Sequence, residues 1–169
     1  MLPAEVGTSP PSLGGRGDFS PLNSRRFGPI RLASRLPLKE AMLTILIADD
    51  EPHVVDLVRL TLEDGRISVK DACDGETALA QAEALLPDLI FLDVHLPDIS
   101  GFEVCARLRQ NPRFGRTKIV MLTAAAQESD VARGLSAGAN HYLTKPFSPV
   151  RLISLVESVA PHVPIWQRG

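Results

Sequence analysis

The chain has 169 residues, of which 44% are hydrophobic and 22% are charged, and its formal net charge is −2 at pH 7. This length suits one hydrophobic core, so we expect a single globular domain. The small negative charge gives no broad basic field, which argues against nucleic acid as a direct partner. No apolar run approaches the roughly 20 residues that span a bilayer, so we expect a soluble protein without membrane contact.

Residues 1–41 differ in composition from the rest of the chain. They are rich in Pro, Gly, Ser and Arg, and their six basic and three acidic residues give +3, against −5 for residues 42–169. Such a segment buries too little apolar surface to offset its ordering entropy, and we expect a disordered tail. Its few acids and several Arg leave a transit peptide as an alternative. Met42, just before the first expected strand, leaves open a start of translation at that residue.

From Met42 onward, short apolar runs alternate with helical patterns. Each helical pattern is a stripe of apolar residues spaced three or four apart. The five runs expected to form strands are LTILIA (43–48), ISV (67–69), LIFL (89–92), KIVMLT (118–123) and HYLT (141–144). The stripes that follow them are Val54/Leu57/Val58/Thr61/Leu62, Ala78/Leu79/Ala82/Leu85/Leu86, Phe102/Cys105/Leu108, Val131/Leu135 and Val150/Ile153/Val156/Val159. We expect Gly65, Pro87 and Gly138 to end the first, second and fourth helices.

Strict alternation of strand and helix is typical of parallel strands joined by right-handed crossovers, with helices on both faces. The predicted fold class is therefore α/β, with a doubly wound five-stranded parallel sheet. A strand order of 2-1-3-4-5 brings strands one and three together. We place the domain at residues 42–160 and a short C-terminal tail at 161–169.

The chain has two cysteines, Cys73 and Cys105, each within a segment expected to be regular structure. Two cysteines in a chain of this length do not suggest a disulfide framework and fit a reducing cytosol. We expect both to be buried free thiols.

Acidic residues stand where two of the expected strands end. Strand one runs into Asp49, Asp50 and Glu51, and strand three runs into Asp93. Ligands of doubly wound sheets bind beyond the carboxyl ends of the strands, at the point where the strand order reverses. Carboxylates gathered there cannot all stay ionised unaided. A small all-oxygen set suits Mg²⁺, whereas Ca²⁺ needs more ligands.

Thr123 and Lys145 stand at the ends of strands four and five. A hydroxyl, an ammonium and a divalent cation together form a pocket for a phosphoryl group. The chain has no GxxxxGK[ST] loop, so nucleotide hydrolysis is not expected. Asp93 is then the predicted acceptor, because a carboxylate can act as a nucleophile and form an acyl phosphate.

Simpler interpretations of the same residues stay open. Asp49 and Asp50 could only cap the helix that starts near Pro52. Thr123 could be only a strand former, Lys145 only a solvated charge, and Tyr142 only a packing residue. We expect no metal ligation by three of the four histidines, which are His53, His141 and His162. None of them has a partner at metal-ligand spacing.

The stretches ILIADDE, LIFLDVHLPDISGFEV, VMLTA and GANHYLTKPF follow one another in this order, each at a strand end. From about residue 43 to 159 the chain resembles the receiver domain of two-component response regulators, whose fold is flavodoxin-like, as in chemotaxis regulators. The resemblance implies that Asp93 is the phosphoacceptor and that Asp50, with Asp49 alongside, binds Mg²⁺. It also implies that Thr123 and Lys145 bind the phosphoryl group.

Three further positions follow from the resemblance. Tyr142 matches an aromatic residue that moves inward on activation. Pro146 matches a position where the Lys–Pro bond is commonly cis in the family. The backbone carbonyl of His95 completes the metal shell, together with Asp49, Asp50 and Asp93. A His side chain is less usual at position 95.

The function expected from this resemblance is a cytoplasmic, stand-alone receiver that is not an enzyme, apart from self-catalysed phosphorylation and dephosphorylation of Asp93. The donor is a sensor histidine kinase or a histidine phosphotransfer protein. The output is a shape change of the face formed by helix four, strand five and helix five, which binds a downstream protein or a second copy. The closing PHVPIWQRG is too short for an output domain.

Three other functions are alternatives to this one. One is a receiver fragment of a larger hybrid kinase or regulator. Another is a metal-dependent aspartyl-phosphate phosphatase, which would need an acid where His95 stands. The third is a scaffold that works without phosphorylation, which the acidic cluster disfavours.

Overall fold

The computed structural model describes residues 43–124, 128–159 and 161, and the side chains of 128–131 are not among the described parts. The expectations for the tail at 1–41 and for residues 162–169 therefore lie outside the described residues. Five strands lie within them: β1 (Leu43–Ala48), β2 (Ile67–Ala72), β3 (Leu89–Asp93), β4 (Lys118–Thr123) and β5 (His141–Thr144). The helices described are α1 (Pro52–Leu62), α2 (Gly75–Leu85), α3 (Gly101–Gln110), α4 (Glu128–Ala137) and α5 (Pro149–Val159), with a short 3₁₀ helix η1 (Pro112–Phe114).

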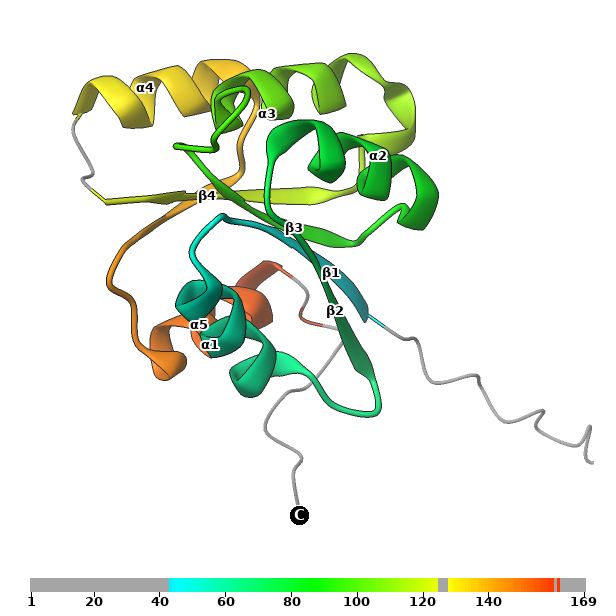
Figure 1. Cartoon of the computed structure of the whole chain (residues 1–169), viewed down its shortest axis with the longest axis vertical. Helices are drawn as coiled ribbons and strands as arrows, with labels where there is room; N and C mark the ends of the chain where they lie inside the picture. Colours follow the sequence, from blue (N-terminus) through cyan, green and yellow to red (C-terminus); the bar gives the residue numbers. More distant parts are fainter. Residues whose placement is uncertain (1–42, 125–127, 160, 162–169) are drawn as a thin grey trace, which may run out of the picture. The chain divides into compact units, whose positions relative to one another are not determined.

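The strands form one parallel sheet in the order β2-β1-β3-β4-β5, which confirms the predicted fold class and strand order. Figure 1 shows α1 and α5 on one face of the sheet and α2, α3 and α4 on the other. Each face has its own buried apolar cluster, because β-strand side chains alternate between the two faces. β3 is buried along its whole length, as expected for a central parallel strand covered on both sides.

Several predicted boundaries and burials were wrong. α1 ends at Leu62 rather than at Gly65, and Glu63 with extended backbone is its C-cap. β2 runs on to Ala72, three residues beyond the predicted ISV. Cys73 follows that strand and is exposed, whereas Cys105 is buried as expected; both are free thiols.

Four residues predicted to lie on buried helix stripes are exposed: Leu85, Leu86, Leu135 and Val150. Leu86 adopts a left-handed conformation (φ 48°) as the C-cap of α2, which turns it away from the stripe. On α5, Val156 is buried as predicted, and Ile153 and Val159 pack partly buried against the same core. The prediction was wrong at the start of the helix, where Leu152 rather than Val150 is buried. Gly138, with φ 92°, ends α4 as predicted, because a left-handed backbone favours glycine there.

Among the described residues, no helix combines the length and the apolarity needed to cross a membrane.

Leu152 and Val150 test the corrected burial at the start of α5. Leu152 is fully buried and Val150 is 64% exposed. We expect Leu152→Ala to lower the free energy of unfolding by about 3 kcal/mol, because it removes buried methyl groups and leaves a cavity. The control Val150→Ala should change it by less than about 0.5 kcal/mol. Equilibrium urea denaturation measures both, and equal effects would contradict the burial of Leu152 in place of Val150.

Candidate functional site

The carboxyl ends of β1 and β3 place three aspartates together. The two strands pair in register up to Ala48 and Leu92, so Asp49 and Asp93 leave the sheet side by side. Asp49 is 2% exposed and Asp93 is 4% exposed, whereas Asp50 is exposed. Oxygen atoms from the three carboxylates lie within 4.8 Å of one another. The predicted acidic cluster is therefore present.

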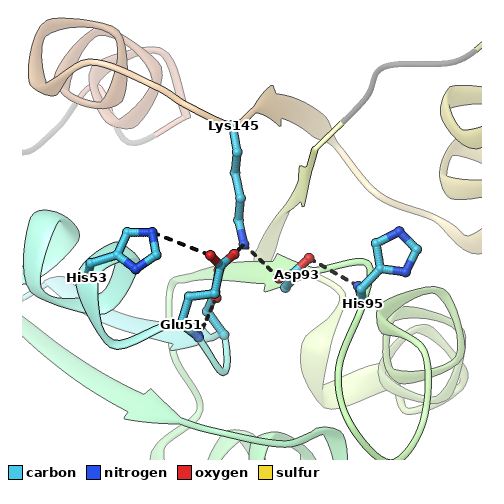
Figure 2. A network of polar contacts seen from close by, with 6 residues as sticks. Glu51, His53, Asp93, His95 and Lys145 are labelled. Carbon is cyan, nitrogen blue, oxygen red and sulfur yellow. Dashed lines mark hydrogen bonds and ion pairs between the residues drawn. The ribbon is translucent and has the colours of Figure 1, made fainter.

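The Lys145 ammonium lies at the centre of this cluster. Its Nζ is 2.7 Å from Asp49 Oδ2, 2.7 Å from Asp93 Oδ2 and 2.8 Å from Glu51 Oε1. Figure 2 shows the Lys145 side chain extending from its strand end toward Glu51 and Asp93. Its main-chain N–H donates to the carbonyl of Thr123 (2.8 Å), which ties the ends of β4 and β5 together. The Lys145–Pro146 bond is cis, as the resemblance implied.

The two buried aspartates are also held from the backbone. Asp49 Oδ1 accepts from the N–H of Glu51 (3.0 Å), and Asp93 Oδ1 accepts from the N–H of His95 (3.0 Å). Each carboxylate thus has one oxygen fixed by the chain and its other oxygen facing Lys145. The N-cap of α1 is Glu51, and no side-chain cap bond forms there, so helix capping does not account for Asp49 and Asp50.

Burial and the neighbouring charges shift the pKa values of three groups in this cluster. Burial raises the pKa of Asp49, and the charge of Asp93 raises it further, although the Lys145 ammonium opposes the rise. The hydrogen bond from Lys145 lowers the pKa of Glu51. Burial by itself would lower the pKa of Lys145, but bonds to Asp49, Asp93 and Glu51 outweigh it and hold that pKa above its ordinary value. Lys145 is therefore a fixed positive charge, and the Asp49 carboxyl group is harder to ionise than an ordinary aspartate.

An open pocket of about 280 Å³ lies over the cluster. Its walls are Asp50, Glu51, Asp93, His95, Ala124 and Lys145. Ala124 is small, so the space above Asp93 stays open.

Of the remaining predicted residues, His95 belongs to the wall of this pocket, whereas Thr123 and Tyr142 do not. Thr123 is buried at the end of β4, and Tyr142 is half-buried on β5, on the face covered by α2, α3 and α4. His95 contributes its backbone N–H to Asp93, and its side chain is exposed. Two other histidines, His53 and His141, are exposed, and His53 Nε2 lies 3.4 Å from Glu51. His162 lies outside the described residues.

Two contributors were missed by the sequence analysis. Glu51 is a direct partner of Lys145, and its place as the third acid of the run Asp49–Asp50–Glu51 was the signal that could have revealed it. Asp98 accepts from the N–H groups of Gly75 (2.7 Å) and Glu76 (2.9 Å), so it binds the loop after Asp93 to the start of α2. No local pattern could reveal that bond, because its partners are 22 and 23 residues away.

The loop after Asp93 is packed tightly against the main chain of Asp93. Gly101 N–H donates to the carbonyl of Val94 (3.0 Å), and a Cβ on Gly101 would lie 2.0 Å from the carbonyl oxygen of Asp93. The first residue of α3 therefore has to be glycine for the helix to start so close to Asp93.

Comparison with known proteins decides the family. The sequence profile described as the response regulator receiver domain matches residues 45–157. The chain belongs to this family. A receiver is a phosphoacceptor signalling module of two-component phosphorelays rather than a classical enzyme, and it implies a histidine kinase as its partner.

Individual relatives agree with this assignment. The chain is 43% identical over 118 residues to the DNA-binding dual master transcriptional regulator RpaA of Synechocystis. The aligned region covers 70% of this chain and 49% of RpaA. It is 41% identical over 117 residues to an uncharacterized 14.6 kDa protein of Leptolyngbya boryana, covering 69% of this chain and 89% of that one. The chain spans about half the length of several curated relatives that it matches, RpaA included.

A solved structure has the same fold. The crystal structure of a putative response regulator from Chloroflexus aurantiacus superimposes with a TM-score of 0.66 and is 41% identical, covering 70% of this chain and 97% of that one. The receiver fold, with its acidic pocket of Asp49, Asp50 and Asp93 beside Lys145, is thus established.

Asp98 gives a test of how the loop of this receiver is held. Its bonds from the N–H groups of Gly75 and then Glu76 lower the pKa of Asp98 from 3.8 to about 2. A carboxyl group whose pKa is depressed by folding stabilises the fold above its unfolded pKa and loses that contribution as the pH falls through its folded pKa. Asp98→Asn should therefore be less stable than the natural chain at pH 6, and the difference should shrink between pH 4 and pH 2.

Urea denaturation across this pH range measures the difference. The control is Asp56→Asn, on an exposed position of α1. A difference for Asp98→Asn that stays constant down to pH 2 would contradict the bond from Asp98 to α2.

Proposed function

We propose that this receiver accepts a phosphoryl group on Asp93 from the phosphohistidine of a sensor histidine kinase or a histidine phosphotransfer protein. The observation that carries the proposal is the pairing of Asp93 Oδ2 with the Lys145 ammonium at 2.7 Å, beside an open pocket. Asp93 is buried, yet it borders the pocket, so its carboxylate is held in place and still reachable. Among the three aspartates, Asp93 is the one that the His95 N–H also orients.

The transfer itself is a displacement at phosphorus. A carboxylate oxygen of Asp93 forms a bond to phosphorus as the bond to the donor imidazole nitrogen breaks, and the imidazole leaves with the electron pair and takes up a proton. The protein contributes position and charge rather than covalent chemistry. Lys145 stays protonated, because three carboxylates hold its pKa up, and its ammonium offsets the negative charge of the incoming phosphoryl oxygens.

The acidic pocket fits Mg²⁺. Asp49, Asp50 and Asp93 present oxygen atoms at close range, and within the described residues the buried Asp49 Oδ2 has no donor in hydrogen-bonding geometry, only the ion-pair contact with Lys145. We propose that these three side chains and the main-chain carbonyl of His95 hold the ion. When bound, Mg²⁺ neutralises carboxylate and phosphoryl charge together.

The response to phosphorylation is proposed to pass through Thr123 and Tyr142. Tyr142 packs on the sheet face that α4 covers and pairs with Met121 of β4. Thr123 lies two residues after Met121, at the end of β4, so its side chain is on the same face. The Thr123 hydroxyl moves inward and donates a hydrogen bond to the new phosphoryl group. The Tyr142 ring moves into the space that Thr123 leaves, and the face formed by α4, β5 and α5 changes shape. A downstream protein, or a second copy of the chain, that binds the two shapes with different affinity receives the signal.

We further propose that the receiver acts in the cytoplasm through contacts with other proteins. Similar chains about as long as one receiver exist, because the match covers 89% of the Leptolyngbya protein and 97% of the Chloroflexus chain. A metal-dependent phosphatase is less well supported, because His95 occupies the position where that reaction needs a second acid. A receiver within a hybrid kinase is the remaining alternative.

Acetyl phosphate with Mg²⁺ tests the acceptor. We expect intact-protein mass spectrometry to show one added phosphoryl group, stable in acid and released by base, and sustained release of product to be absent. Asp93→Asn should abolish the adduct, because an amide cannot act as the nucleophile. The control Asp56→Asn, exposed on α1, should keep it. An adduct of equal yield on Asp93→Asn would move the acceptor to another residue.

A further inference from the structure

Tyr142 packs directly on the backbone of α4 at Gly134. A Cβ built on Gly134 would lie 1.1 Å from the Tyr142 hydroxyl oxygen and 2.3 Å from Cζ of the ring. Gly134 is buried, and the ring is half-buried against the cluster that α2, α3 and α4 cover. The phenol therefore occupies the volume that any other residue at position 134 would fill.

Local backbone conformation does not explain this glycine. Gly134 lies inside α4, and its backbone has no positive φ. Glycine in a helix interior lowers helix stability relative to alanine, because it loses more conformational freedom on folding. The ring of Tyr142 is the feature of the structure that requires a residue without a side chain at position 134.

The backbone of α4 is fixed next to the ring, so the ring has to move if residue 134 gains a side chain. Cys105 Sγ donates to the carbonyl of Ala137 (3.3 Å), and Arg109 Nε donates to the carbonyl of Gly138 (2.8 Å). The Arg133 guanidinium lies 4.6 Å from the centroid of the Phe102 ring, which adds a cation–π contact between α4 and α3. By contrast, the phenol is the far end of a side chain with two rotatable bonds.

We propose that Gly134 is a positioning residue for Tyr142. Because Gly134 has no side chain, the phenol packs directly on the backbone of α4, and we call this contact the seat of the ring. The position of the ring is thereby coupled to the position of α4. The coupling deepens the proposed function, on which it rests, because Tyr142 lies on the same sheet face as Thr123 and would follow it on phosphorylation. An alanine at position 134 expels the ring from this seat while the fold persists. Tyr142→Phe does not relieve the conflict, because Cζ is still too close.

Tyr142 is the only tyrosine in the chain, which gives a single spectroscopic probe. Biosynthetic labelling with 3-fluorotyrosine yields one ¹⁹F resonance, and its shift between H₂O and D₂O reports the exposure of the ring. For the natural chain we expect a shift well below that of the urea-unfolded chain. For Gly134→Ala we expect it to approach the unfolded value while circular dichroism stays native. The control Ser136→Ala, at an exposed position of the same helix, should leave the resonance unchanged.

Unfolding equilibria give a second readout. In a Tyr142→Ala background, Gly134→Ala should raise the folding equilibrium constant about fivefold, which is the ordinary gain of alanine over glycine in a helix. With Tyr142 present, the gain should be smaller or reversed, because the ring has to be displaced. Equal gains in both backgrounds, or an unmoved ¹⁹F resonance in Gly134→Ala, would overturn the proposal.

The two proposals fail separately. The ¹⁹F measurement and the unfolding cycle need no phosphorylation, so they can confirm the seat even if acetyl phosphate does not modify Asp93. Addition of Mg²⁺ and beryllofluoride, a phosphoryl mimic, then tests the coupling. The resonance of the natural chain should shift, and that of Gly134→Ala should shift less than half as far. Equal shifts would leave Gly134 without a role in the response.

Discussion

The arrangement of the whole site depends on one ammonium group among carboxylates. Lys145 reaches from the end of β5 to Asp49 at the end of β1 and to Asp93 at the end of β3, and so joins strands that are not neighbours in the chain. Parallel strands and their crossovers bring these three ends to one edge of the sheet. Without the ammonium, two buried carboxylates would face each other unpaired, which is costly in a protein interior. The same ion pairs keep Asp93 oriented and the lysine charged.

This pairing leaves the pocket short of positive charge. Asp49, Asp50, Glu51 and Asp93 place four carboxyl groups in this pocket, and Lys145 pairs with three of them. Burial, and after it the charge of Asp93, raises the pKa of Asp49. A divalent cation would correct this imbalance, so the proposed metal site and the proposed phosphoryl site depend on the same charges. Under the proposed function, a phosphoryl group on Asp93 would change this balance close to Thr123 at the end of β4 and to Tyr142 of β5, whose ring packs against α4.

Much of this could be predicted from the sequence, because the information is local. The strands and the acidic strand ends followed from the apolar runs and the residues that end them, whereas the strand order came from the expected fold class. Asp49, Asp50, Asp93 and Lys145 do meet. Helix faces were less predictable: Leu135 and Val150 fit a stripe in the sequence but are exposed, since a short amphipathic pattern allows two neighbouring faces. Long-range contacts were beyond reach. The bond of Asp98 to α2 and the seat of Tyr142 on Gly134 depend on elements that meet only in the folded chain.

Calorimetric titration with Mg²⁺ at neutral pH tests most directly the claim that the acidic strand ends need a second cation. We predict saturable binding of one ion by the natural chain. Asp50→Asn should weaken it at least about tenfold, as loss of a group that orients or holds a metal commonly does. Asp56→Asn, exposed on α1, should bind as the natural chain does. Absence of binding, or equal affinity in Asp50→Asn, would contradict the account.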